Sequence, residues 1–201
     1  ALDAGSWKGA QFAGERIPTL SEALSLARDG MEIYVEIKCG TDILPRLIQV
    51  MAAEPKATPA RVVFISFSSA VISAVRQQFP AYRAYWLTSV SDSGGAPSPS
   101  AASAIATMQA KGATGLDAYA HALVDAAYVQ AVKSAGYSFH VWTVNDIARA
   151  AELSAMGVET ITTDRGGYLA TALNEPAPAP VPVVHWTFDG GSPTNLGSGG
   201  S

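Results

Sequence analysis

Residues 32–38, Glu32-Ile33-Tyr34-Val35-Glu36-Ile37-Lys38, have the alternating pattern of a β-strand with two different faces. One face carries Ile33, Val35 and Ile37, and the other carries Tyr34, Glu36 and Lys38. In a β/α barrel the outer face of a strand packs against helices, so we expect the apolar set to point outward and Glu36 and Lys38 to point inward. Their place at the carboxyl end of the strand is where barrel enzymes hold their active sites. A structural ion pair, or an edge strand with one wet face, would explain the same pattern.

Strand-like and helix-like segments alternate on both sides of this stretch. We predict strands at 33–37, 62–67, 82–87, 115–119, 138–144 and 160–163. We predict helices at 44–53, 69–79 and 101–110, one capped by Asp125 and ending before Gly136, and one capped by Asp146 and ending at Gly157. Residues 89–100 are rich in Ser, Gly and Pro and are predicted to be a loop. This order indicates an α/β protein with a parallel sheet. Because it has no Gly-rich nucleotide fingerprint, it favours a partial (β/α)8 TIM barrel with fewer than eight strands.

The composition suits a folded domain and argues against several classes of function. The chain has 201 residues, 48% of them hydrophobic, and a net charge of −4 from 13 Lys+Arg and 17 Asp+Glu. It has no basic stripe for nucleic acid, no apolar run of membrane-spanning length and no signal-peptide pattern. Its single cysteine, Cys39, excludes an intramolecular disulfide. The sequence contains no HExxH, paired CxxC, GxSxG or P-loop motif.

The organisation changes after residue 173. We expect an N-terminally incomplete barrel over 1–173, because six predicted strands fall short of eight. The chain begins at Ala1 rather than at Met, as a processed protein or a piece of a longer one would. Residues 174–182 alternate proline with other residues, which predicts an extended linker. Residues 183–201 begin with a strand-like run and then become rich in Gly and Ser, which indicates the start of a further module.

Other polar and aromatic residues fall at the ends of predicted strands. Trp142, Asn145 and Asp164 belong to the expected catalytic rim, but core packing for Trp142 and turn or cap roles for the other two explain each position taken singly. Of the histidines, His140 is mid-strand and is expected to be packed. His121 lies in a loop, where it would reach a site or face solvent, and His185 lies beyond the linker.

Six motifs together resemble the glycerophosphodiester phosphodiesterase family. They run in the family's order and approximate spacing: Leu2-Asp3-Ala4-Gly5-Ser6-Trp7, Gly14-Glu15-Arg16-Ile17-Pro18-Thr19-Leu20, Val35-Glu36-Ile37-Lys38, Ile65-Ser66-Phe67, Val141-Trp142-Thr143-Val144-Asn145-Asp146 and Thr162-Thr163-Asp164-Arg165. The resemblance covers about residues 1–170 and implies a TIM barrel. It also implies a metal-dependent hydrolase that cleaves glycerophosphodiesters to glycerol 3-phosphate and an alcohol.

The resemblance implies roles for particular residues. Glu36 matches a ligand of the divalent cation, usually Ca²⁺ or Mg²⁺, Lys38 matches a lysine facing the substrate phosphate, and Trp142 matches an aromatic residue on the glycerol side of the pocket. Phe67 and Glu15 lie in matching motifs without an assigned role. The family's two catalytic histidines and two further metal carboxylates lie before the LDAGSW block. We therefore expect no catalytic residue in this chain, which we expect to be inactive by itself and poorly stable, because a barrel without its first strands has unpaired edges.

Alternatives to this function stay open on the sequence. A degenerate barrel that binds a phosphodiester or a sugar phosphate without turnover fits the same residues. A sphingomyelinase-D-like phospholipase of the same superfamily fits less well, because GERIPTL and WTVND favour the glycerophosphodiesterase branch. Residues 184–190 resemble the first strand of a laminin-G or concanavalin A-like module, which implies a carbohydrate or surface ligand. That resemblance also implies an extracellular, periplasmic or cell-surface location.

Overall fold

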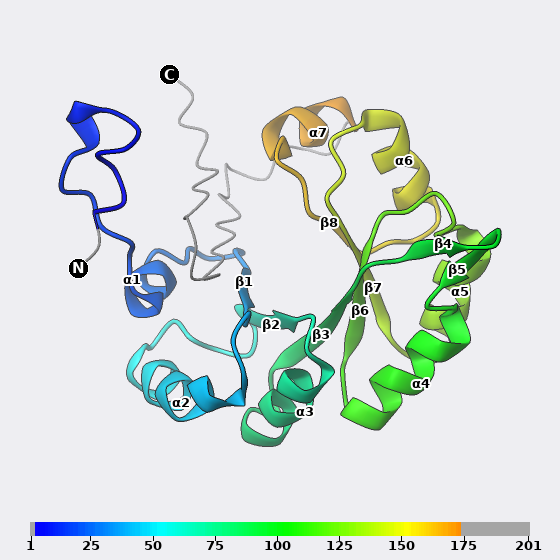
Figure 1. Cartoon of the computed structure of the whole chain (residues 1–201), viewed down its shortest axis with the longest axis horizontal. Coiled ribbons are helices and arrows are strands. Elements are labelled where there is room, and N and C mark those ends of the chain that lie inside the picture. The colour runs from blue at the N-terminus through cyan, green and yellow to red at the C-terminus, as the bar shows by residue number, and fades with distance from the viewer. Residues whose placement is uncertain (1–2, 174–201) are drawn as a thin grey trace.

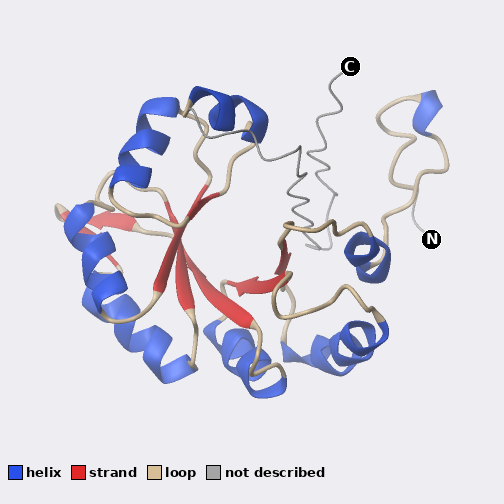
Figure 2. Cartoon of the chain, turned by 180° about the vertical axis from the view of Figure 1, so that it is seen from behind, coloured by secondary structure: helices blue, strands red, loops and turns tan. Residues whose placement is uncertain are grey.

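Parallel pairing joins six strands into one curled sheet with helices on its outer side (Figure 1 and Figure 2). The computed structural model describes residues 3–173. The strand order is β1 (Ile33–Glu36), β2 (Val62–Ser66), β3 (Arg83–Thr88), β6 (Gly115–Tyr119), β7 (Ser138–Trp142) and β8 (Thr160–Ile161). Within these residues β1 and β8 form the two edges of the sheet. This arrangement is the predicted partial barrel.

Of the described helices, five lie between the strands in sequence, one precedes β1 and one follows β8, and Figure 2 shows helices along the convex face of the sheet. They are α1 (Leu20–Ser25), α2 (Leu44–Ala53), α3 (Ser69–Gln78), α4 (Ala101–Lys111), α5 (Ala126–Ser134), α6 (Ile147–Ala155) and α7 (Gly166–Ala172), with short 3-10 turns at η1 (Ala10–Phe12) and η2 (Thr41–Ile43). Both predicted caps are confirmed: the carboxylate of Asp125 accepts from the backbone N–H of Tyr128, and that of Asp146 from the N–H of Arg149, each at 2.8 Å. None of the described helices has the length and apolar character needed to cross a bilayer.

The core has two parts, one on each face of the sheet. The larger part lies between sheet and helices and includes Ile33, Val35 and Ile37. The smaller part lies on the concave face and consists of Val63, Ile65, Tyr85 and Leu87, with Tyr34 and Trp142 packed against it. The predicted division of β1 into an outward apolar face and an inward polar face is therefore confirmed for Tyr34 and the three apolar residues.

The structure corrects the prediction of a loop at 89–100. Two short antiparallel strands, β4 (Ser91–Ser93) and β5 (Ala96–Ser98), form a hairpin there. Gly94 and Gly95 connect them with φ angles of 67° and 85°. Two successive residues with positive φ match the twist of a tight hairpin, and glycine adopts that conformation without steric cost.

Two strands end earlier than predicted. β7 ends at Trp142 instead of residue 144, and β8 at Ile161 instead of residue 163. Backbone bonds still join the two segments beyond those ends, from Thr162 N to Val141 O at 2.8 Å and from Val144 N to Thr162 O at 2.9 Å. The chain segments stay paired but leave the regular strand geometry, which places their side chains at the rim of the sheet.

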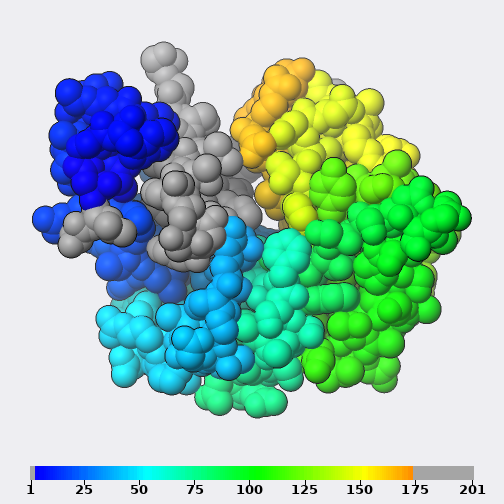
Figure 3. Space-filling view, in the orientation of Figure 1, coloured from blue at the N-terminus to red at the C-terminus, as the bar shows by residue number. Residues whose placement is uncertain are grey.

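Residues 3–19 form a separate turn-rich segment that projects from the rest of the described chain (Figure 3). The Asp3 carboxylate accepts from Gly5 N, Ser6 N, Ser6 Oγ and Gly14 N, and the Ser6 hydroxyl is the main cause that holds the pKa of Asp3 well below its usual range. A Cβ on Gly5 would lie 1.9 Å from the carbonyl oxygen of Phe12, so this position requires glycine. The predicted linker at 174–182, the strand at 183–189 and His185 lie outside the described residues.

Candidate functional site

Glu36 and Lys38 lie at the carboxyl end of β1 and form the charged centre of the candidate site. Glu36 is in register with Ile65, which belongs to the concave-face core, so its side chain is on the concave face. Its side chain is 5% exposed, whereas that of Lys38 is 27% exposed, and Lys38 Nζ lies 4.0 Å from Glu36 Oε2. The Lys38 ammonium is partly exposed, whereas the Glu36 carboxylate beside it is buried. A phosphate oxygen can therefore reach the lysine cation.

Ser66 holds the end of β1 in place. Its buried hydroxyl donates to the carbonyl oxygen of Ile37 at 2.7 Å and accepts from Ser68 N at 3.2 Å. Ile37 N also donates to the carbonyl of Ile65 at 2.9 Å. Both backbone polar groups of Ile37, which lies between Glu36 and Lys38, are thus bonded to residues of β2. The Ile65-Ser66-Phe67 motif therefore has a positioning role in the structure.

Asp117 is a second buried carboxylate on the concave face, and the sequence analysis missed it. It is 2% exposed and lies in register with Leu87 and His140. The signal that would have found it is the alternation already used for β1, because Leu116 and Ala118 on either side belong to the core beneath the helices. Only two apolar residues, Leu116 and Ala118, mark the outer face of this strand, which begins at Gly115.

Three aromatic rings gather at the carboxyl end of the sheet. Trp142 is in register with Tyr119, and their ring centroids are 5.3 Å apart. Phe67 meets Trp142 edge to face at 5.6 Å and 82°. The indole N–H of Trp142 donates to the carbonyl of Asp117 at 3.1 Å, which fixes the ring. Phe67 and Tyr119 remain 50% and 43% exposed, so the rings offer an apolar wall beside the charged groups.

Asn145 and Asp164 meet each other at the rim. Asn145 Nδ2 donates to Asp164 Oδ2 at 2.7 Å, while Asn145 Oδ1 accepts from Thr163 Oγ1 and from Asp164 N, both at 2.9 Å. These bonds tie the segment after β7 to the segment after β8. Their geometry matches the turn-stabilising role weighed for them in the sequence.

Glu15 lies apart from the sheet, in the projecting segment. Its carbonyl oxygen accepts from Ala4 N at 2.7 Å, and its own N–H donates to Phe12 O at 3.2 Å. Its side chain is exposed. In this structure Glu15 contributes to the turn and not to the charged centre at Glu36 and Lys38.

The histidines of the described residues have structural partners. His140 is 3% exposed, stacks on Tyr85 at 4.1 Å and 16°, and places Nδ1 2.7 Å from Thr160 Oγ1. Burial, with Arg83 and Lys133 nearby, lowers its pKa to about 3. His121 accepts from Leu123 N through Nδ1 at 3.1 Å. The expectation that His140 is packed is confirmed.

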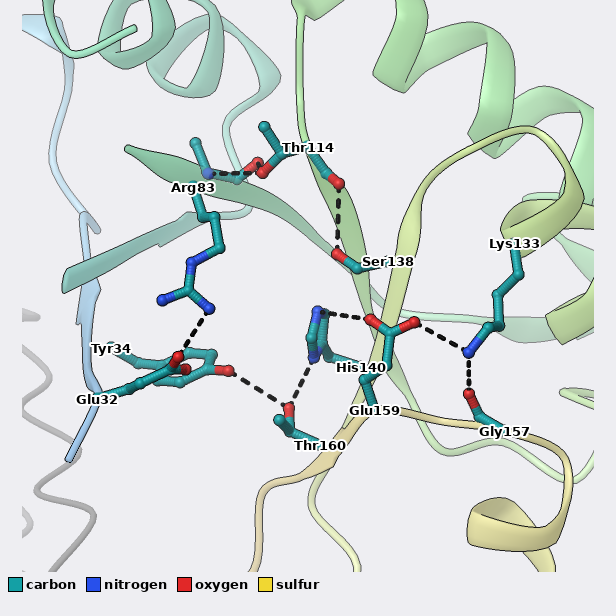
Figure 4. A network of polar contacts seen from close by, with 11 residues as sticks. Glu32, Tyr34, Arg83, Thr114, Lys133, Ser138, His140, Gly157, Glu159 and Thr160 are labelled. Atoms are coloured by element: carbon teal, nitrogen blue, oxygen red, sulfur yellow. Dashed lines mark hydrogen bonds and ion pairs between the residues drawn. The ribbon is translucent and has the colours of Figure 1, made fainter. Parts of the chain in front are cut away.

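A hollow lies at the opposite, amino end of the sheet (Figure 4). It has a volume of about 480 Å³. Its lining includes Glu32, Arg83, Ser138, His140, Glu159 and Thr160. Barrel enzymes bind and convert their substrates at the carboxyl ends of the strands. This hollow is therefore separate from the candidate site.

The described residues do not complete a metal site. Within 3–173 no three His, Cys, Asp or Glu side chains are grouped closely enough to hold a metal ion. Glu36 offers one carboxylate, whereas Ca²⁺ and Mg²⁺ take about six or more oxygen ligands. Glu36 would therefore need further ligands to hold such an ion.

Comparisons with known proteins agree on one family. The model of the Glycerophosphoryl diester phosphodiesterase family matches residues 1–167. A putative glycerophosphodiester phosphodiesterase of Bacillus subtilis (strain 168) is 27% identical over 169 residues, which cover 81% of this chain and 65% of the relative. The chain thus spans 65% of the length of that curated relative.

Solved structures show the same fold. An Oleispira antarctica phosphodiesterase, solved in complex with the product sn-glycerol-3-phosphate, is 24% identical with a TM-score of 0.69, covering 85% of this chain and 67% of that one. A glycerophosphodiester phosphodiesterase from Parabacteroides distasonis is 23% identical with a TM-score of 0.63, covering 80% and 65%. The likeness confirms the predicted partial TIM barrel.

Proposed function

This chain belongs to the glycerophosphoryl diester phosphodiesterase family, and on that premise we propose that it supplies the phosphate- and glycerol-binding part of an enzyme that hydrolyses glycerophosphodiesters to glycerol 3-phosphate and an alcohol. One observation carries the proposal: Glu36 and Lys38 lie 4.0 Å apart at the carboxyl end of β1, within the segment that the family model matches. The match to this family favours it over the sphingomyelinase-D-like alternative.

Different side chains at the carboxyl end of the sheet bind the phosphate and the glycerol of the substrate. The Lys38 ammonium pairs with a phosphate oxygen, because it is partly exposed and carries the charge opposite to the phosphate. The Trp142 ring covers the carbon face of the glycerol, with Phe67 and Tyr119 beside it. Ser66 keeps Lys38 at its position through the Ile37 carbonyl.

Glu36 is proposed as one ligand of a divalent cation, Ca²⁺ or Mg²⁺. Such an ion supplies charge stabilisation to the phosphoryl oxygens when bound. Since the described residues hold only part of a ligand set, the binding roles of Lys38 and Trp142 are proposed without the ion. The proposed location is extracellular, periplasmic or at the cell surface.

General acid and base catalysis needs side chains that His140 and His121 do not supply. His140 is buried beside the amino-end hollow with its pKa lowered to about 3, and neither His140 nor His121 matches the family's catalytic histidines, which lie before the LDAGSW block. We therefore propose that this chain by itself binds glycerol 3-phosphate without turning over glycerophosphodiesters. Release of glycerol 3-phosphate from glycerophosphocholine by this chain with Ca²⁺ or Mg²⁺ would contradict this statement.

The binding role of Lys38 is tested by titration calorimetry with sn-glycerol 3-phosphate. We expect Lys38→Met to weaken binding about tenfold, because a charge-assisted hydrogen bond contributes roughly 1.5–3 kcal/mol. Lys111→Met is the matched control, since Lys111 lies in the last turn of α4 in the outer helical layer. Equal affinities for the two variants would refute the assignment of Lys38.

A further inference from the structure

Tyr119 is the last residue of β6 and lies beside the ring proposed to cover the glycerol. Strand alternation places it on the concave side of the sheet, as it does Asp117 two residues earlier. Tyr119 is in register with Trp142, and their ring centroids lie 5.3 Å apart with the ring planes inclined at 58°. The two rings therefore meet at an angle instead of stacking flat. A small ligand on the indole would have the phenol at its side.

Of the three rings at the carboxyl end of the sheet, only that of Tyr119 has a polar group left for a ligand. Phe67 carries no polar group, and the indole N–H of Trp142 already donates to the carbonyl of Asp117 at 3.1 Å. The hydroxyl of Tyr119 forms no hydrogen bond to another described residue, and Tyr119 is 43% exposed. This hydroxyl is therefore accessible, and it both donates and accepts hydrogen bonds.

Other uncharged polar groups near Tyr119 bond within the protein. Asn145 Nδ2 donates to Asp164 Oδ2 at 2.7 Å, which joins the segments after β7 and β8. The His121 ring lies 6.5 Å from the Tyr119 ring, and its Nδ1 accepts from Leu123 N at 3.1 Å. The Tyr119 hydroxyl is therefore the group we expect to bond a neutral ligand on the indole.

We propose that Tyr119 is a specificity-determining residue, whose hydroxyl forms a hydrogen bond with a hydroxyl of the glycerol unit. The proposal rests on the proposed function, because it requires the phosphate at Lys38 and the carbon chain on Trp142. The indole contacts carbon atoms and does not distinguish glycerol from a propyl chain, and Lys38 contacts only the phosphate. Tyr119 makes this distinction, because a ligand without hydroxyls leaves the phenol without a ligand partner. Since Tyr119 is partly exposed, water can replace that partner, and the discrimination is modest.

The test compares sn-glycerol 3-phosphate with n-propyl phosphate by titration calorimetry. Both ligands are phosphate monoesters of a three-carbon alcohol, but n-propyl phosphate has no hydroxyl group on its carbon chain. Tyr119→Phe keeps the ring and removes only the phenol oxygen. We expect it to weaken the binding of glycerol 3-phosphate about fivefold and to leave that of propyl phosphate unchanged, because one neutral hydrogen bond is lost. The readout is the ratio of the two Kd values, in which the difference in hydrophobicity between the ligands cancels when the two chains are compared.

Two further variants serve as controls. Tyr137→Phe makes the same chemical change at a tyrosine that precedes β7, at the opposite end of the sheet, and should leave both affinities unchanged. Lys38→Met should weaken both ligands by the same factor, because both carry the phosphate. The ratio of the two Kd values therefore responds to Tyr119 and not to Lys38.

The outcomes separate this inference from the proposed function. An unchanged ratio in Tyr119→Phe would place the recognition of the glycerol hydroxyls on another residue, and equal weakening of both ligands would mean a structural role for the phenol. Either result would overturn the inference and leave the phosphate site at Lys38 standing. Failure of the unchanged chain to bind either ligand would instead refute the proposed function, and this inference with it.

Discussion

His140 is a base whose surroundings oppose its protonation. Burial is the main cause, and the positive charges of Arg83 and Lys133 add to it, so the pKa falls from 6.5 to about 3. The carboxylate of Glu159 at 3.7 Å offsets little of this, because its side chain is 39% exposed and screened by solvent. The folded state therefore holds this imidazole neutral across the physiological range.

This shift predicts a pH dependence of stability. Well above pH 6.5 His140 is neutral in both the folded and the unfolded chain, so it does not change the free energy of unfolding with pH. As pH falls from 6.5 toward 3, the unfolded chain binds a proton that the folded chain does not, so stability falls by up to about 1.4 kcal/mol per pH unit. Urea unfolding between about pH 5 and 7 should show a steeper loss for the unchanged chain than for His140→Gln. Parallel slopes would mean that His140 titrates alike in both states.

Single residues show how far the sequence could define the site. The alternation at 32–38 was enough to place Tyr34 and the apolar residues of β1 on the correct faces, because a strand repeats every two residues. Asp117 was missed because its strand begins with Gly115 and has only Leu116 and Ala118 to mark an apolar face. The meeting of Asn145 with Asp164 was also not predictable, since it depends on the spatial neighbourhood of β7 and β8.

At the scale of elements, helix starts were predicted well because a cap is a local interaction. Asp125 and Asp146 bond to backbone N–H groups three residues ahead, and that spacing is visible in the sequence. The β4–β5 hairpin was missed because Ser, Gly and Pro also favour loops, and pairing depends on the partner strand. The early ends of β7 and β8 are likewise set by the contact between the two strands.

The cap of α6 gives a prediction at this scale. Asp146→Ala removes the acceptor for Arg149 N and should lower the free energy of unfolding by roughly 1 kcal/mol. Asp146→Asn keeps an oxygen at the same position and should lower it by only a few tenths of that amount. Thermal unfolding followed by circular dichroism measures both. If the two variants lose the same stability, the hydrogen bond at this position is not what stabilises the helix start.

For the molecule as a whole, the two ends of the curled sheet carry different sets of polar and charged side chains. The carboxyl end carries Glu36, Lys38 and the three rings, and the amino end carries the compensated ion pairs around His140. Family membership and fold were predictable, because six ordered motifs span most of the chain. The polar hollow was not predictable, because its lining comes from residues at the starts of several strands that only the fold brings together.

The carboxyl end of the sheet is the proposed phosphate site, and backbone amide NMR with sn-glycerol 3-phosphate distinguishes this assignment from binding elsewhere on the protein. At saturating ligand we expect shift changes concentrated at residues 36–38, 66–67 and 142, and unchanged shifts at Ser138 and Thr160 in the amino-end hollow. Shift changes centred on Ser138 and Thr160, or no change at residues 36–38 at saturating ligand, would contradict it.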